Sequence, residues 1–337
     1  MNHTIESQFR LSAGCTIRME ANGVNVGTRE EDIWIESNQP NAIARFLERL
    51  QGRGATYEAV ADLEVPERAA ADMIEQLRDS DLLLDIDGVI NARGPDALVL
   101  AFQREARFWA KAIFEQSFWG VLLEGGCSQS QVYGWGVEFY HFVDAANTYM
   151  PIGVAHTRQE RSIRPALAKH YVEEMNHGEI FLNGLRHSGI DTKSVIAAPP
   201  LPHTAALINN LTELAYEGGV AYTACFAIMQ PGLSNGTAPE LEQFYRALTD
   251  LYPFAGEMFA AFHKHASMDL TLHHDAPPFF ALCRDEPGLS VQSRRRASQV
   301  MQTVAESFIL FFEGIYDEYG VSPTFTPRRP FRLEAVR

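Results

Sequence analysis

Residues Lys169 to Leu185 read KHYVEEMNHGEIFLNGL, and this stretch decides how the rest of the chain is interpreted. At 3.6 residues per turn, Glu174 and His177 project from one face of a helix about a turn apart, with His170 beside them. Glu-x-x-His pairs of this kind hold iron or manganese between the facing helices of a bundle. The stretch therefore predicts one half of a metal site.

A second helix with suitable residues is predicted further along the chain, in HKHASMDLTLHHD. His265, Asp269 and His273 occur there at successive i+4 steps, which drift by only about 80° around a helix axis. If the two helices face each other, their imidazoles and carboxylates meet in the core. We predict Glu174, His177, His265 and Asp269 as metal ligands and catalytic residues, with His273 as a further ligand. Two ordinary solvated helix faces are the alternative.

Length and composition limit the classes of protein to consider. Of 337 residues, 46% are hydrophobic and 11% aromatic, as in a globular protein long enough for two domains. A net charge of −15 argues against nucleic acid or an anionic membrane surface as a partner. The four cysteines form no C-x-x-C pair, which favours reduced thiols. No secretory signal or long apolar run is present, so we expect a cytoplasmic protein.

The N-terminal region combines strand-like and helical patterns. Residues 8–36 alternate in polarity around an Asn-Gly hairpin signal, which predicts three or four short antiparallel strands. Residues 40–50 place apolar side chains at helical spacing, and residues 82–90 are expected to close the region as a strand or wing. We predict a small α+β, winged-helix-like domain over residues 1–94. It lacks a basic recognition helix, so DNA binding is disfavoured.

The segments FRLSAGCTIRMEANG, AIARFLERLQGRGATYEAVADL and MIEQLRDSDLLLD resemble the peptide-chaperone domain of pyrroloquinoline quinone biosynthesis. They equally resemble the related recognition elements of enzymes that modify ribosomally made peptides. This resemblance implies that a precursor or leader peptide adds as an extra strand at the sheet edge, where backbone groups supply affinity and pockets supply selectivity. The alternative is a domain that serves only for docking or oligomerisation. The sequence does not decide whether the protein forms a homodimer.

The remainder of the chain is predicted to be helical almost throughout, with Pro- and Gly-rich loops and no phosphate-binding loop, G-x-S-x-G motif or internal repeat. We predict an all-α domain over residues 95–325 and an extended tail over residues 326–337. Within a predicted helix at residues 131–149, Glu138 and His141 stand at i and i+3. They are a further candidate pair, although their aromatic neighbours favour a core position.

The order of YGWGVEFYHFVDAANTYMPIGVAH, LAKHYVEEMNHGEIFLNGLRHSGID, YTACFAIMQ and FHKHASMDLTLHH is similar to the haem-oxygenase-like fold. More narrowly, it resembles the non-haem diiron oxidases and oxygenases of that fold. Their ligands are a Glu and a His from one helix, a second Glu from a later helix, and His-x3-Asp-x2-His from the last. The resemblance assigns Glu174, His177, His265 and Asp269 as ligands, and it implies dioxygen as co-substrate and an external reductant.

Two positions depart from the family pattern. Gln230 stands where a carboxylate is expected, and Leu272 stands where the last histidine is expected, with His273 one position later. One position on a regular helix is a rotation of about 100°, which only a π-bulge would recover. Two irons normally need about three or four carboxylates, whereas two histidines and one carboxylate hold one iron. The sequence leaves the count at one or two irons.

We therefore predict a mainly α protein in which a winged-helix-like domain precedes a haem-oxygenase-like bundle. The bundle is expected to be a non-haem iron oxidase or oxygenase acting on a peptide-derived or small natural-product substrate, in the modification of a ribosomal peptide. One alternative is a metal-free oxidase or hydrolase resembling pyrroloquinoline quinone synthase or thiaminase, with His170, His177 and His265 as acid–base groups. The other is a non-catalytic peptide-binding scaffold.

Overall fold

The computed structural model describes residues 8–29, 31–52, 55–56, 67–158, 162–230, 237–271, 277–285 and 288–328. The chain forms two compact units. The first comprises Met1–Gln116, Thr223–Ser234 and Pro277–Ala305, and the second comprises Ser117–Tyr222, Asn235–Ala276 and Glu306–Arg337. These units interleave along the chain, and the domain boundaries expected after residues 94 and 325 stay predictions.

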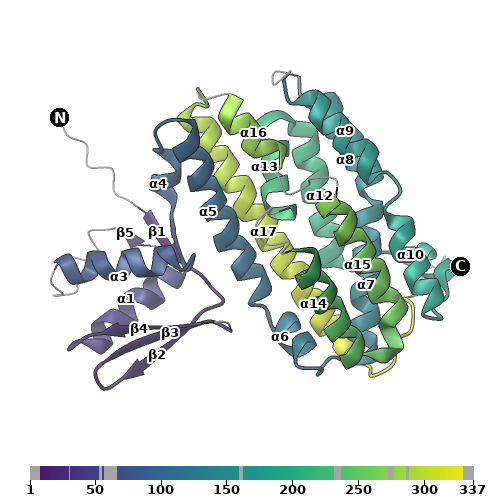
Figure 1. Ribbon diagram of the computed structural model, residues 1–337, viewed down its shortest axis with the longest axis horizontal. Helices are drawn as coiled ribbons and strands as arrows, with labels where there is room; N and C mark the ends of the chain where they lie inside the picture. Colours follow the sequence, from purple (N-terminus) through teal and green to yellow (C-terminus); the bar gives the residue numbers. More distant parts are fainter. Residues whose placement is uncertain are drawn as a thin grey trace, which may run out of the picture. The chain divides into compact units, whose positions relative to one another are not determined.

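Two small antiparallel sheets belong to the first unit, with the strand orders β2-β3-β4 and β5-β1-β6 (Figure 1). The strands are β1 Gln8–Leu11, β2 Thr16–Glu20, β3 Gly23–Gly27, β4 Asp32–Glu36, β5 Ala55–Thr56 and β6 Leu83–Asp85. The β2-β3 hairpin pairs Glu20 with Gly23, so Ala21 and Asn22 form its turn and Gly23 begins β3. The prediction of short antiparallel strands in residues 8–36 is confirmed.

Strand β4 shows how an alternating pattern produces one buried and one exposed face. Ile33 and Ile35 join the same buried cluster as Leu47 of helix α1, which spans Pro40–Gly52. Between them Trp34 points outward and is 42% exposed. Within the described part of the chain β4 is an edge strand of its sheet, so one row of its backbone groups is unpaired by strands.

The prediction of a closing strand or wing in residues 82–90 is confirmed for the strand, because β6 pairs with β1, but no wing follows, since β6 leads directly into helix α4, Ile86–Ile90. Asp85 is the N-cap of this helix, and its Oδ1 accepts a hydrogen bond from the Gly88 backbone N–H at 2.8 Å. A Cβ at Gly88 would come within 2.6 Å of the Asp85 carboxylate, so the glycine allows the close cap. Its role is capping and not the turn of a wing.

Helices complete the first unit. They are α3 Glu67–Asp79, α5 Pro95–Phe114 and α16 Pro278–Asp285, together with parts of α13 Gly219–Met229 and α17 Val291–Gly320. Phe102 of α5 packs edge-to-face on Phe279 of α16 at 4.8 Å between ring centroids. One turn from Phe102, the fully buried Glu105 accepts a hydrogen bond from Ser298 of α17 at 2.6 Å. This interior therefore contains a carboxyl group among aromatic rings.

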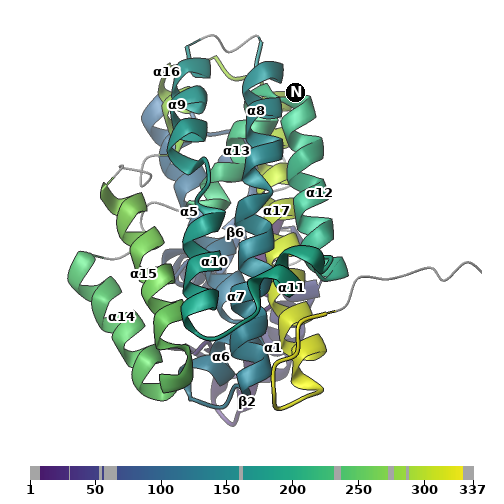
Figure 2. The same ribbon diagram turned by 90° about the vertical axis from the view of Figure 1, so that its right-hand side faces the viewer.

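The second unit is a helical bundle. Its helices are α6 Ser117–Leu123, α7 Gln129–Asp144, α8 Ala146–His156, α9 Arg164–Glu174, α10 Gly178–His187, α11 Thr192–Ala197, α12 Pro202–Glu217, α14 Ala238–Leu251, η1 Pro253–Ala255 and α15 Gly256–Thr271, with the ends of α13 and α17. Helix α10 packs against both α7 and α15, and α14 lines the outer side of α15 (Figures 1 and 2). The helix predicted at residues 131–149 is in fact α7 followed by α8.

Two glycines explain why α7 packs so closely with its neighbours. A Cβ at Gly134 would come within 2.4 Å of the Tyr319 ring, and one at Gly136 would come within 2.3 Å of the Met258 sulfur. Trp135 between them packs on Phe262 of α15 at 4.4 Å. The Gly-Trp-Gly sequence thus places one large ring in the core and admits two neighbouring side chains to the α7 backbone.

The predicted fold class is confirmed in its main terms, because the protein is mainly helical with a small N-terminal α+β region. All four cysteines are buried and free of disulfides. None of the helices in the described ranges combines the length and the apolar character needed to cross a membrane.

Candidate metal centre

The stretch that the sequence presents as one helix is broken in the structure. Helix α9 ends at Glu174 and α10 begins at Gly178, with Asn176 in the left-handed region at φ 67°. Asparagine tolerates this conformation better than most residues, and its N–H donates to Oδ1 of Asn147 at 3.2 Å. Helical spacing was therefore the wrong reason for pairing Glu174 with His177, since a turn brings them together.

Glu174 lies at the middle of a buried cluster of imidazoles. Its Oε2 is 2.8 Å from Nδ1 of His177, and its Oε1 is 3.4 Å from Nε2 of His170. From α15, His265 places Nε2 at 3.8 Å from the same Oε2. One donor atom each from Glu174, His177 and His265 lies within 4.8 Å of the others. The structure thus brings three of the predicted site residues together.

The other predicted site residues do not belong to this group of three donors. Asp269 is one turn beyond His265 on α15, with its Oδ2 3.3 Å from His265 Nδ1. His273 and Leu272 lie outside the described residues. Gln230 directly follows α13 and belongs to the first unit. Asp269 therefore contacts the cluster through His265, an arrangement that fixes which imidazole nitrogen faces the other donors.

The electrostatics of the cluster favour a positive charge at His265. Burial alone lowers the pKa of this imidazole, but the carboxylates of Asp269 and Glu174 outweigh it and raise the pKa to about 9. The same two carboxylates would stabilise a metal cation as well as a proton. A site that attracts positive charge this strongly is chemically suited to a divalent ion.

Aromatic rings form the wall around His265. Phe181 of α10 lies 5.0 Å from the His265 ring and 4.9 Å from Phe262. Phe181 and Phe262 are both buried. The sequence pattern alone did not single out these residues, because phenylalanines at helical spacing occur in any helical core. Their effect here is to keep water away from the imidazole and to hold its ring plane.

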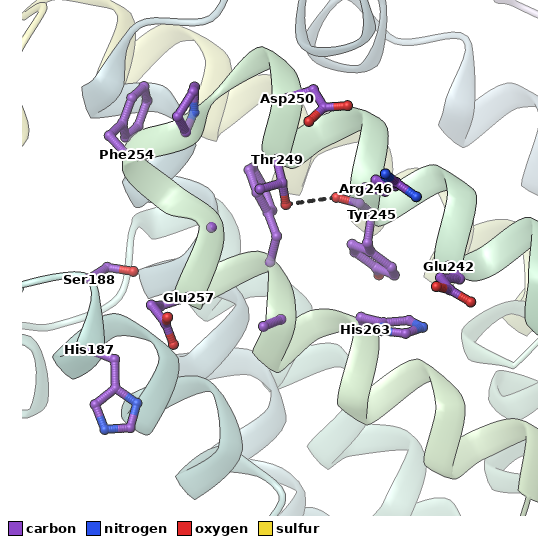
Figure 3. Close-up of a pocket in the computed structure, with 14 residues that line it drawn as sticks. His187, Ser188, Glu242, Tyr245, Arg246, Thr249, Asp250, Phe254, Glu257 and His263 are labelled. Atoms are coloured by element: carbon purple, nitrogen blue, oxygen red, sulfur yellow. Dashed lines mark hydrogen bonds between the residues drawn. The ribbon is translucent and has the colours of Figure 1, made fainter.

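A groove of about 820 Å³ lies along α14 and α15 (Figure 3). Figure 3 shows His263 beneath the ring of Tyr245, with Glu242 beside them, and the two rings are 5.7 Å apart. Burial raises the pKa of Tyr245, and the charge of Asp269 raises it further. Tyr245 thus lines the groove while standing within electrostatic reach of Asp269, a position that no sequence motif signalled.

The second i,i+3 pair, Glu138 and His141, is not part of the donor group. The Glu138 carboxylate is fully buried and accepts hydrogen bonds from the Leu201 backbone N–H and the Tyr319 hydroxyl, each at 2.8 Å. Burial raises its pKa, and these donors lower it in part. Because both oxygens already have protein donors, Glu138 has a structural role in joining α7, α12 and α17.

Comparisons with known proteins agree with this geometry. The sequence profile of a family described as iron-containing redox enzymes matches residues 134–304. A domain of unknown function with a haem oxygenase-like fold from Shewanella denitrificans OS217 superposes with a TM-score of 0.55 at 17% identity, covering 68% of this chain and 96% of that chain. A search of curated proteins gives no match.

Two TenA homologues are also similar in structure. The protein from P. horikoshii OT3 has a TM-score of 0.45 at 12% identity, covering 64% of this chain and 96% of its own. The protein from Pseudomonas syringae pv. tomato DC3000 has a TM-score of 0.49 at 13% identity, covering 67% of this chain and 94% of its own. Likeness at this level indicates no activity or substrate.

The predicted haem-oxygenase-like fold of the helical region is confirmed. The peptide-chaperone resemblance of residues 1–94 lies outside the profile match and stays a prediction. The matched segment includes all the donor residues of the buried cluster. Because it spans just over half of the 337 residues, this chain belongs to the family of iron-containing redox enzymes.

Proposed function

We propose that this protein is a non-haem iron oxidase or oxygenase that uses dioxygen, with Glu174, His177 and His265 holding one iron. The observation that carries this proposal is the approach of their donor atoms to within 4.8 Å of one another, inside the segment matched by the family. Two imidazoles and one carboxylate suit Fe(II) and leave coordination positions for dioxygen and substrate.

The state of His265 supports the fit of a metal ion. Its Nε2 is buried and forms no hydrogen bond with the described residues, since Glu174 at 3.8 Å is too distant. Its Nδ1 faces Asp269 at 3.3 Å. An imidazole held by a carboxylate through one nitrogen, with the other buried and directed at further donors, is the usual arrangement of a metal-bound histidine.

Each residue around the proposed iron site has its own role. Iron bound there would supply activation of dioxygen and one-electron oxidation of a substrate. Asp269 selects the tautomer of His265, and His170 holds the second oxygen of Glu174. Phe181 and Phe262 exclude water from the imidazole side. An external reductant is required for any reaction that returns the iron to Fe(II).

Iron reconstitution tests this proposal. The protein is freed of metal with a chelator, loaded anaerobically with Fe(II), and assayed for bound iron and then for dioxygen consumption with reductant. We expect one iron per chain in the wild type and in His187→Ala, an exposed control on α10, and loss of iron in His265→Ala with the fold intact. Equal iron in His265→Ala, or iron binding without dioxygen consumption, contradicts the proposal.

We also propose that the N-terminal region binds a precursor peptide, and that a residue of this peptide is the substrate. Support comes from the edge position of β4 and from the exposed Trp34 on it, which suit addition of a peptide strand. Calorimetric titration with peptides encoded beside the gene should show binding that Trp34→Ala weakens and that Met19→Ala, exposed on the opposite edge strand β2, does not. Turnover of a free small molecule without affinity for any such peptide contradicts this step.

A metal-free acid–base reaction is the second candidate. The observation that favours it is the chain of carboxylate, imidazole and carboxylate formed by Asp269, His265 and Glu174. At 3.8 Å the Glu174 oxygen is too distant to share a proton with His265 directly, but the imidazole beside Asp269 can exchange one with a substrate without a metal. Activity that survives complete removal of iron selects this candidate, whereas activity that tracks iron content selects the first.

A further inference from the structure

Alternate residues of β4 turn their backbone groups toward the open edge of the sheet. Ser37, directly after β4, donates its N–H to the Asn22 carbonyl on the β3 side at 2.9 Å. In an antiparallel ladder, residues that bond to the partner strand alternate with residues that bond away from it. Counting back from Ser37, the residues whose backbone N–H and C=O point away from β3 are Asp32, Trp34 and Glu36.

The side chains of the same three residues share the exposed face of the sheet. Burial alternates along β4, and Asp32, Trp34 and Glu36 are its exposed positions. At a rise of about 3.4 Å per residue, the two acidic residues stand about 14 Å apart along the strand, with the tryptophan between them. A strand added at this edge would bond to their backbone groups and place every second side chain beside theirs.

Oxygen atoms gather above Gly27, at the Asp32 end of this face. Three side-chain oxygens lie within 3.3 Å of the position that a Cβ would take at this glycine: Asp32 Oδ1, Thr16 Oγ1 and Asn25 Oδ1. The Asn25 oxygen has no hydrogen-bond donor among the described residues. Acceptors gathered in this way favour an ammonium group, which carries three N–H donors.

The indole of Trp34 covers the corresponding space at the other end of the face. A Cβ at Gly23 would come within 2.6 Å of the Trp34 ring, so the ring lies over this glycine. Gly23 pairs with Glu36 on one side and with Glu20 on the other, and both glutamates are exposed. An exposed indole in a row with two carboxylates is suited to a cationic side chain.

The charges of the three strands leave this edge negative. Strands β2, β3 and β4 contain three acidic residues and one basic residue, Arg18. Arg18 lies on β2, which is separated from β4 by β3. The guanidinium of Arg29, at the start of β4, donates instead to the backbone carbonyls of Glu115 and Gln116. The β4 edge is therefore electrostatically complementary to a basic partner.

We propose that β4 recognises an extended peptide segment with basic residues at its first and fifth positions and an apolar residue at its third. The apolar side chain lies opposite Trp34, and the basic side chains reach Asp32 and Glu36. Because the pattern reads the same from either end, it applies to parallel and to antiparallel addition. This inference rests on the proposed binding of a precursor peptide at β4 and names the chemistry of the segment that is bound.

Three synthetic peptides, blocked at both ends, test the pattern. GSKTITKSG carries it, GSKTIKTSG has the same composition with one lysine moved to the other face of the strand, and GSETITESG replaces both lysines by glutamate. Each is titrated by calorimetry into the full chain at low salt and up to millimolar concentration. We expect GSKTITKSG to bind about threefold more tightly than GSKTIKTSG and at least about tenfold more tightly than GSETITESG. Added salt should weaken GSKTITKSG most.

Paired substitutions on β4 identify the residues that read the lysines. Asp32→Asn with Glu36→Gln should weaken GSKTITKSG by about fivefold, because two ion pairs are lost. Glu48→Gln with Asp72→Asn, two exposed acids on α1 and α3, is the charge-matched control and should leave the affinity unchanged. Asp32→Lys with Glu36→Lys should reverse the preference, so that GSETITESG binds more tightly than GSKTITKSG.

Each outcome separates this inference from the proposed function. Equal affinity for the three peptides, no binding of GSKTITKSG, an unchanged affinity in the Asn and Gln variant, or no reversal in the double Lys variant overturns the inference. Binding of the peptides encoded beside the gene, weakened by Trp34→Ala, would then leave the proposed precursor peptide standing. A lysine preference that depends on Asp32 and Glu36, without affinity for any such encoded peptide, overturns the proposed precursor alone.

Discussion

Two buried glutamates of the second unit have different surroundings. Glu138 is fully buried and Glu174 is 9% exposed, so burial hardly separates them. The partners of Glu138 are a peptide N–H and a tyrosine hydroxyl, which do not change charge near pH 7. Those of Glu174 are the imidazoles of His170, His177 and His265, a type of side chain that serves as a metal ligand in many proteins. The partners of a buried carboxylate, and not its burial, therefore decide whether it serves the fold or a binding site.

The largest expected effect is a difference in iron affinity between two variants, in which either Glu174 or Glu138 is replaced by glutamine. Glu174→Gln removes a charged donor from the cluster and should lower iron affinity by more than about 100-fold, since outer contacts of a metal site alone are worth up to that much. Iron content after anaerobic loading measures this.

Glu138→Gln is the matched control, and it should keep iron close to the wild-type stoichiometry. Iron loss of the same size in both variants would remove the distinction between the two glutamates.

The free energy of unfolding should fall more when Glu138 is replaced than when Glu174 is replaced, which is the reverse of the order expected for iron binding. Glu138→Ala leaves the Leu201 N–H and the Tyr319 hydroxyl buried without an acceptor, so we expect a loss of about 4 kcal/mol in the free energy of unfolding. Glu174→Ala should cost less than half of that in metal-free protein, because His265, whose pKa Glu174 helps to raise, can then become neutral. Urea denaturation of both variants provides the measurement, and a larger loss in Glu174→Ala contradicts the comparison.

A third buried carboxyl extends the comparison to the first unit. Burial raises the pKa of Glu105 to about 7 from its ordinary 4.5, against a hydrogen bond from Ser298 that lowers it. A folded-state pKa above the unfolded value stabilises the protein below pH 4.5, and this contribution is lost as the pH rises through 7. The total loss is about 3 kcal/mol.

Glu105→Gln isolates this effect, because the amide does not titrate. The difference in unfolding free energy between wild type and Glu105→Gln, measured by urea denaturation from pH 5 to pH 8, should change in favour of the variant as the pH rises. A difference that is constant over this range would show that Glu105 ionises as an ordinary carboxyl group.

The smallest expected effect concerns the position of the Tyr319 ring, whose hydroxyl donates to Glu138. Gly134→Ala would place a methyl group within 2.4 Å of the Tyr319 ring and displace it, at a cost of about 2 kcal/mol in unfolding free energy. Gly288→Ala is the control, because a Cβ there meets nothing within 4 Å. Thermal melting compares the two, and equal melting temperatures would mean that the Tyr319 ring shifts without cost.

The sequence predicted the donors of the site better than their geometry. Residue types and spacing identified Glu174, His177 and His265, which the structure brings together. The break at Asn176 was missed, because asparagine is accepted both in helices and in left-handed turns and so gives no local signal.

The partners of Glu138 could not be predicted at all. Leu201 is 63 positions away from it in the chain and Tyr319 is 181 positions away, so only the folded bundle brings them together. The strands were predictable because an alternating pattern and a hairpin signal are local. Contacts such as those of Glu138 depend on tertiary packing that no local pattern encodes.

The exposed Trp34 gives the protein a built-in optical reporter. The chain has four tryptophans, and three of them, Trp109, Trp119 and Trp135, are at most 7% exposed. A collisional quencher such as iodide will therefore reach mainly the indole of Trp34 on β4, which is 42% exposed. Emission that becomes shielded from iodide on addition of a peptide reports occupancy of the β4 edge, separately from any event at the buried histidines.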